Sequence, residues 1–180
     1  MINALYLLIL IGMLGAADTL YFHEWRTRLP VLGKRASAEL RLHAARDFIY
    51  AILFATLPRI AWKGLWAGVL VLLLLGEAVL TMWDFMVEDW VRKPLGGVYP
   101  AERVMHAVMG ILYGAMLVYL IPSLQLWWGT STRFTALEVP VQSWLRWTML
   151  IMSIGVFASG VRDLCASFDV RGSAWPWKHE

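Results

Sequence analysis

The sequence predicts an all-α integral membrane protein with five transmembrane helices. Hydrophobic residues make up 59% of its 180 residues and charged residues only 16%, whereas a soluble domain carries about a quarter charged residues. The hydrophobic residues are concentrated in runs close to the roughly 20 residues that a helix needs to cross a bilayer. Because these runs are continuously apolar instead of alternating, they favour helices over a membrane barrel.

Five apolar runs define the predicted spans, which cover about residues 4–21, 44–60, 65–86, 104–124 and 141–164. The first run is interpreted as an uncleaved span, because its start, Met-Ile-Asn, lacks the basic side chain of a signal peptide. A polar tail over residues 165–180 completes a single membrane domain.

The Lys and Arg residues predict the orientation of the spans. Twelve of the sixteen lie in segments on one side of the membrane, and the other side receives Arg59, Lys63, Arg133 and Arg146. Because short cytoplasmic segments retain positive charge, we expect the N-terminus outside and the C-terminus in the cytoplasm. We expect the membrane to be a bacterial inner membrane.

A duplicated pattern opens the second and the fourth spans. Each copy places a carboxylate, an imidazole and a phenol at i, i+4 and i+11: Glu39, His43 and Tyr50 in the first, and Glu102, His106 and Tyr113 in the second. These positions share one face of a helix. The pattern therefore predicts two columns of ionisable side chains inside a bundle.

An acidic residue precedes each column at the end of the preceding apolar run, Asp18 before the first and Asp84 before the second. We interpret residues 4–60 and 65–124 as two repeated helical hairpins, related by a pseudo-twofold axis along the membrane normal. They would form a four-helix bundle core, with the span 141–164 as a peripheral helix.

This topology predicts a metal site near the cytoplasmic face. Six ligands are expected at a similar depth: Asp18, Glu39, His43, Asp84, Glu102 and His106. Carboxylates and imidazoles bind Fe or Mn and, less diagnostically, Zn. Four-helix di-metal proteins use a comparable ligand logic with Glu-x-x-His, whereas the interval here is one residue longer. We therefore expect two iron ions, with Mn or Zn as alternatives.

Further polar residues surround these ligands. Tyr50 and Tyr113 are candidate redox-active phenols or hydrogen-bond donors, with ordinary packing as the alternative role. Four other residues could replace a ligand: His23, Asp47, Glu77 and Glu88. On a regular helix, however, His23 would lie off the face that carries Asp18.

Each ligand candidate also has a simpler explanation. Glu39 and Glu102 lie in first helical turns, where an acid interacts favourably with the helix dipole. A Glu and a His at i and i+4 can form a local hydrogen bond, and Asp18 or Asp84 can pair with nearby arginines. The recurrence favours the metal site, because capping a helix does not require His and Tyr at the same offsets twice. Ionisable groups within spans are also costly, so they point to function.

The sequence thus favours a di-iron oxidoreductase that activates dioxygen and acts on a lipidic substrate from the membrane. An electron-donor protein or a larger membrane complex would be its partner, beside the membrane lipids. Two alternatives remain open: a b-type haem held by His43 and His106, and a metal or ion permease or accessory subunit. No phosphate-binding loop or long basic stripe is present, so nucleic-acid binding is not expected.

Overall fold

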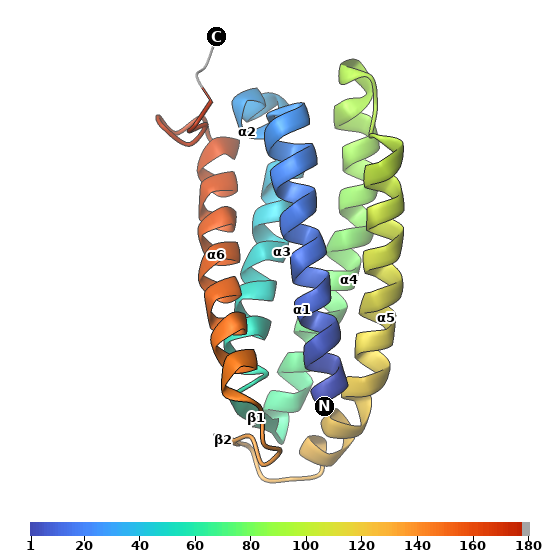
Figure 1. The fold of residues 1–180 in the computed structure, drawn as a ribbon, viewed down its shortest axis with the longest axis vertical. Coiled ribbons are helices and arrows are strands. Elements are labelled where there is room, and N and C mark those ends of the chain that lie inside the picture. The colour runs from blue at the N-terminus through green and yellow to red at the C-terminus, as the bar shows by residue number, and fades with distance from the viewer. Residues whose placement is uncertain (178–180) are drawn as a thin grey trace.

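The computed structural model describes residues 1–177 and consists mainly of long antiparallel helices (Figure 1). The last residues of the predicted polar tail, 178–180, lie outside the described part. The helices are α1 (Ile2–Asp18), α2 (Leu29–Leu32), α3 (Ser37–Thr56), α4 (Leu65–Arg92), α5 (Pro100–Trp128) and α6 (Ser143–Ser167). A π-helical segment, Thr19–Thr27, continues α1, and short 3₁₀ turns cover Gly33–Ala36 and Lys93–Leu95.

A small two-stranded antiparallel sheet lies at the end of the bundle that carries the N-terminus (Figure 1). Strand β1 (Ile60–Lys63) pairs with β2 (Arg133–Ala136), so that Ile60 lies opposite Ala136. The adjoining Gly64 has φ 62°, and a Cβ there would lie 2.5 Å from the Cα of Thr132. Glycine is therefore required where β1 meets α4.

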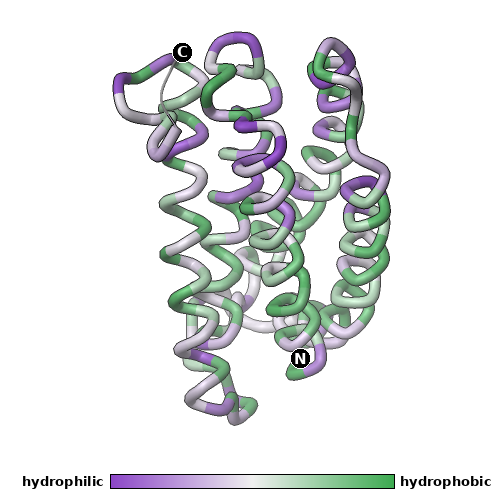
Figure 2. Tube along the Cα trace, turned by 45° about the horizontal axis from the view of Figure 1, so that its top comes forward, coloured by the Kyte–Doolittle hydropathy of each residue, from purple (hydrophilic) through white to green (hydrophobic). Residues whose placement is uncertain are grey.

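Within residues 1–177, four helical segments are long and apolar enough to cross a membrane: Ile2–Thr27, Leu65–Leu95, Pro100–Trp128 and Ser143–Ser167. This finding supports the predicted class, a helical membrane protein. Helix α3 does not meet the same criterion, because Glu39, Arg41, Arg46 and Asp47 all lie within it. Figure 2 shows hydrophobic residues along the long helices, and many hydrophilic ones at the end that carries the C-terminus.

Each helix of one predicted helical hairpin packs along a helix of the other hairpin. Helix α1 packs along α5, and α3 packs along α4, so the first helix of each repeat contacts the second helix of the other. An apolar core fills the half of the bundle nearer the β1–β2 sheet and includes Leu8, Leu53, Leu70 and Leu120. The polar side chains are thereby concentrated in the opposite half.

Helix α6, which was predicted to be peripheral to the four-helix core, packs closely along the length of α3. The contact depends on Gly160, where a Cβ would lie 2.9 Å from the Cβ of Asp47 and 3.2 Å from the carbonyl oxygen of Ala44. Small residues allow such close approach between membrane helices.

We expect Gly160→Val to lower the free energy of unfolding by about 1–3 kcal/mol, because the added atoms would force α6 away from α3. Gly155→Val is the matched control, since a Cβ at Gly155 meets no atom within 4 Å. Reversible unfolding in a denaturing detergent measures both variants. Equal stability of the two would contradict a tight α3–α6 contact at Gly160.

Candidate metal centre

The polar half of the bundle holds an unusual number of buried ionisable side chains. They come from α1 and its π-helical continuation, α3, α4, α5 and α6: Asp18, His23, Glu39, His43, Glu77, Asp84, Glu88, Arg92, Glu102 and Asp163. Buried charges are retained only where partners or metals compensate them. The contacts among these side chains therefore decide what the site can bind.

Four of these side chains converge in a manner suited to a metal ion. Asp18, His23, Glu102 and His106, named here the four-ligand group, offer ligand atoms that all lie within 4.8 Å of one another. Nε2 of His106 lies 3.2 Å from Oδ2 of Asp18, and Nε2 of His23 lies 3.2 Å from Oε1 of Glu102. Two imidazoles and two carboxylates suit Fe, Mn or Zn.

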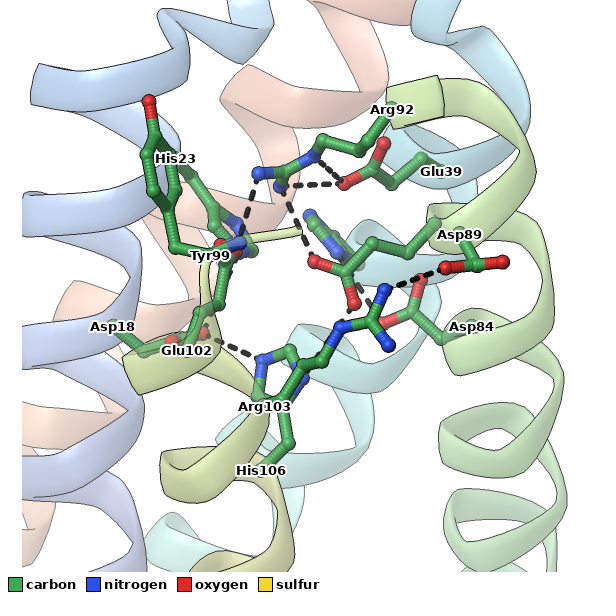
Figure 3. Close-up of polar contacts among 12 residues, drawn as sticks. Asp18, His23, Glu39, Asp84, Asp89, Arg92, Tyr99, Glu102, Arg103 and His106 are labelled. Carbon is green, nitrogen blue, oxygen red and sulfur yellow. Dashed lines mark hydrogen bonds and ion pairs between the residues drawn. The ribbon is translucent and has the colours of Figure 1, made fainter. Parts of the chain in front are cut away.

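Two atoms of the four-ligand group are available to bind a metal ion, because neither forms a hydrogen bond in the described structure. Oδ1 of Asp18 and Nε2 of His23 are buried and form no hydrogen bond in the described structure. Glu102, by contrast, also caps a helix, because its Oε2 accepts a hydrogen bond from the Tyr99 backbone N–H at the start of α5 (Figure 3). The first-turn role expected for Glu102 and its position in the group thus coexist on different oxygens.

The π-helical segment explains why His23 belongs to the group. A π-helix forms i→i+5 hydrogen bonds, and such segments often occur at functional sites. His23 follows Asp18 by five positions, and its Nε2 lies 3.4 Å from Oδ2 of Asp18. The prediction that His23 would lie off this face assumed a regular α-helix and is wrong for that reason.

The same segment aligns the two repeats. Relative to α4, the π-helical segment contains one extra residue, after which Trp25 corresponds to Trp90. His23 then corresponds to Glu88, and Thr27 corresponds to Arg92. The counterpart of the four-ligand group therefore consists of Glu39, His43, Asp84 and Glu88.

This counterpart group repeats one contact of the four-ligand group. Nε2 of His43 lies 3.3 Å from Oδ2 of Asp84, as Nε2 of His106 lies 3.2 Å from Oδ2 of Asp18. Its carboxylates, however, are occupied by arginines. Arg46 donates to Asp84 over 2.7 Å, and Arg92 donates to Oε1 of Glu39 over 2.6 and 2.9 Å.

Arg92 also joins the two groups (Figure 3). Its Nη1 donates to Oγ1 of Thr27, the corresponding residue of the other repeat, over 2.9 Å, and to Oε1 of Glu102 over 3.1 Å. Its Nη2 lies 3.5 Å from Oε1 of Glu88. The guanidinium thus has three carboxylates around it and is almost fully buried.

The repeats differ in the cations that they supply. Arg46 and Arg92 neutralise the counterpart group, while the corresponding positions beside the four-ligand group hold Met109 and Thr27. Within residues 1–177, the one arginine that contacts the four-ligand group is Arg92, which donates a hydrogen bond to Glu102. A divalent cation would supply the positive charge that this half of the duplication lacks.

The six predicted ligands therefore do not form one ligand set, although four of them, Asp18, His43, Asp84 and His106, line one pocket. Asp18, Glu102 and His106 are brought together, whereas Glu39 is held by Arg92. The two groups adjoin each other: the rings of His23 and His43 stack with their centroids 4.6 Å apart. Nδ1 of His106 also lies 3.5 Å from Oε2 of Glu88.

The remaining predicted residues line the pocket or support it. Glu77 accepts a hydrogen bond from Oγ1 of Thr81 over 2.7 Å and lies 3.6 Å from Nε of Arg46. The Tyr113 hydroxyl donates a hydrogen bond to the Leu74 carbonyl over 2.9 Å. Tyr50 and Asp47 also line the pocket.

The sequence analysis did not predict Asp163 as a residue of the site, nor the two buried arginines, Arg46 and Arg92. Asp163 of α6 is buried, and its Oδ2 lies 3.8 Å from Nδ1 of His43. The repeat could not indicate it, because α6 has no counterpart in the duplication. An acidic residue near the end of an apolar run was the available signal, the same signal that pointed to Asp18 and Asp84.

The four-ligand group opens into a cavity of about 1050 Å³ that reaches from the polar half into the bundle. The group can therefore bind a cation next to a space that accepts a much larger molecule. Comparison with family models, with curated proteins and with solved structures gave no match, so the chemistry of this site is the basis for the function.

Proposed function

We propose that the chain is a membrane metalloenzyme, an oxidoreductase that acts on a lipidic substrate at a buried centre near the cytoplasmic face. The observation that carries this proposal is the four-ligand group, whose four ligand atoms lie within 4.8 Å of one another beside a large cavity. A structural ion pair does not require two histidines, two carboxylates and an adjoining empty space.

Iron is the proposed metal, with Mn and Zn as alternatives that share this ligand preference. The sequence pattern favoured two ions, but the contacts support one. In the counterpart group, Arg46 and Arg92 already supply two positive charges to Asp84 and Glu39. A second divalent cation there would have to displace these arginines, so we propose one ion per chain.

The protein would contribute orientation and a dry environment to the reaction. Bound iron supplies the capacity to activate dioxygen, and an external electron-donor protein or complex supplies the electrons. Glu88 faces Nδ1 of His106, which fixes the ring so that Nε2 points at the centre. Apolar cavity walls exclude water from the reacting end of the lipid.

The proposed topology has five spans, with α3 as the fifth. Its charged side chains reach partners inside the bundle, as Glu39 reaches Arg92 and Arg46 reaches Asp84, so α3 can cross a membrane despite its charges. The distribution of Lys and Arg supports an outer N-terminus and a cytoplasmic C-terminus, in a bacterial inner membrane.

The alternative functions have less support from the contacts. A haem held by His43 and His106 requires two imidazoles directed at one iron, but each faces its own aspartate within 3.3 Å, and His43 stacks on His23. A permease requires a polar path through the bundle, whereas the half nearer the β1–β2 sheet is filled by the apolar core.

Metal analysis of the detergent-purified protein, loaded with Fe(II) under anaerobic conditions and desalted, tests the proposal. We expect about one iron per chain, no haem absorption band, and loss of the iron in Asp18→Asn, because this carboxylate contacts both histidines of the group. Oxygen uptake that depends on added lipid and on a reductant would then establish the oxidoreductase. Wild-type protein without retained metal, or with stoichiometric haem, would refute it.

A further inference from the structure

The cavity beside the four-ligand group has a polar end and an apolar end. Asp18, His43 and Asp84 line the polar end, and Asp84 presents a buried Oδ1 without a hydrogen-bond partner. At the other end, a Cβ on Gly12 would overlap the Cε of Met152 and lie 2.5 Å from Cζ of Phe54. These side chains therefore close the cavity inside the apolar part of the bundle.

Glycines on three helices line the space between these ends. A Cβ on Gly110 of α5 or on Gly155 of α6 would meet no atom within 4 Å, and one on Gly15 of α1 would reach only Sδ of Met109, at 4.0 Å. All three glycines line the cavity. The missing side chains leave room along the bundle for an elongated molecule.

Helices α1 and α6 both contribute lining residues to the cavity. Helix α1 packs along α5 and α6 packs along α3, so α1 and α6 contact each other only sparsely. Ala16 of α1, Leu20 of its π-helical continuation and Ala158 of α6 line the cavity and are also exposed on the outside. A membrane molecule can therefore reach the cavity from the bilayer.

The charges in the cavity select against anions. Its basic lining residues are two arginines, Arg46 and Arg162, and three histidines that each face a carboxylate. Its acidic lining residues outnumber them: Asp18, Glu24, Asp47, Glu77, Asp84 and Asp163. Both arginines are engaged, Arg46 with Asp84 and Arg162 with Glu24. An anionic head group would meet like charges in a site of low polarity, which is strongly unfavourable.

We infer that the cavity binds one neutral, single-chain lipid, whose chain extends toward Phe54 and whose uncharged polar or olefinic end lies at the four-ligand group. This inference deepens the proposed function by naming the class of substrate, and it rests on that function only for the reaction at the metal. Long-chain or isoprenoid alcohols belong to the class, whereas free fatty acids and phospholipids are excluded by charge.

Two fluorescent polyenes that differ only in their head group test the inference. Parinaryl alcohol is neutral and parinaric acid is anionic, and energy transfer from tryptophan reports binding in detergent micelles. We expect saturable binding of one alcohol per chain and binding of the acid that is at least about tenfold weaker. Gly155→Leu should weaken binding of the alcohol by about tenfold or more, because the leucine fills the cavity.

Gly114→Leu is the matched control, because a Cβ there also meets no atom within 4 Å but the residue does not line the cavity. Gly110→Leu provides a second cavity-filling variant if Gly155→Leu does not fold. Equal binding by the cavity and control variants, or equal affinity for acid and alcohol, would overturn the inference. Saturable alcohol binding by a protein that retains no iron would uphold it while refuting the proposed function.

Discussion

Arg92→Met is expected to lower the free energy of unfolding by about 3–5 kcal/mol, the typical cost of removing one partner from a buried ion network. Arg92 is 1% exposed and lies within 3.5 Å of carboxylate oxygens of Glu39, Glu88 and Glu102. Methionine approximates the length of the side chain but leaves these acids without their shared cation. Unfolding in a denaturing detergent, monitored by circular dichroism, measures the effect.

Arg103→Met is the control for this prediction, because Arg103 makes an ion pair of the same type in water. Its partner is Asp89, at 2.7 Å, and the two side chains are 60% and 68% exposed. Exposed pairs contribute about 0–1 kcal/mol, so this variant should unfold almost as the wild type does. If both variants lost the same stability, the buried network would not be the reason for the effect at Arg92.

His106→Ala is expected to weaken metal binding by more than about 100-fold, since loss of a supporting residue alone typically costs 10- to 100-fold. His43→Ala removes the corresponding imidazole of the other repeat and should weaken binding by about tenfold or less. The difference arises because His106 belongs to the four-ligand group, while His43 faces Asp84, which Arg46 already neutralises.

Electron paramagnetic resonance of free Mn(II) measures both affinities without any assumption about the reaction. The two histidines serve as mutual controls, because each is the imidazole of a duplicated Glu-x-x-x-His and the Nε2 of each lies within 3.3 Å of an aspartate. Equal losses in the two variants would mean that the ion is shared between the repeats. Losses in the reverse order would place it in the counterpart group.

The tertiary contacts changed the interpretation of individual ligands. The sequence presented Glu39 and Glu102 as equivalent, but only Glu102 contacts a histidine of the four-ligand group, while Glu39 is held by Arg92. Nothing in the repeated residues themselves distinguishes the two acids. The two repeats differ at one aligned position, where the first has Thr27 and the second has Arg92. This alignment takes the extra residue of the π-helical segment into account.

The sequence by itself determined the helical membrane class, the duplicated acid and histidine columns, and their common end of the bundle. Hydrophobic run length and helical periodicity carry this information locally, within a single segment. Only the tertiary structure decided that His23 joins Asp18, Glu102 and His106, and that α6 brings Asp163 to the pocket. Such contacts depend on a local departure from α-helical geometry and on packing between distant segments, and neither follows from the periodicity of one helix.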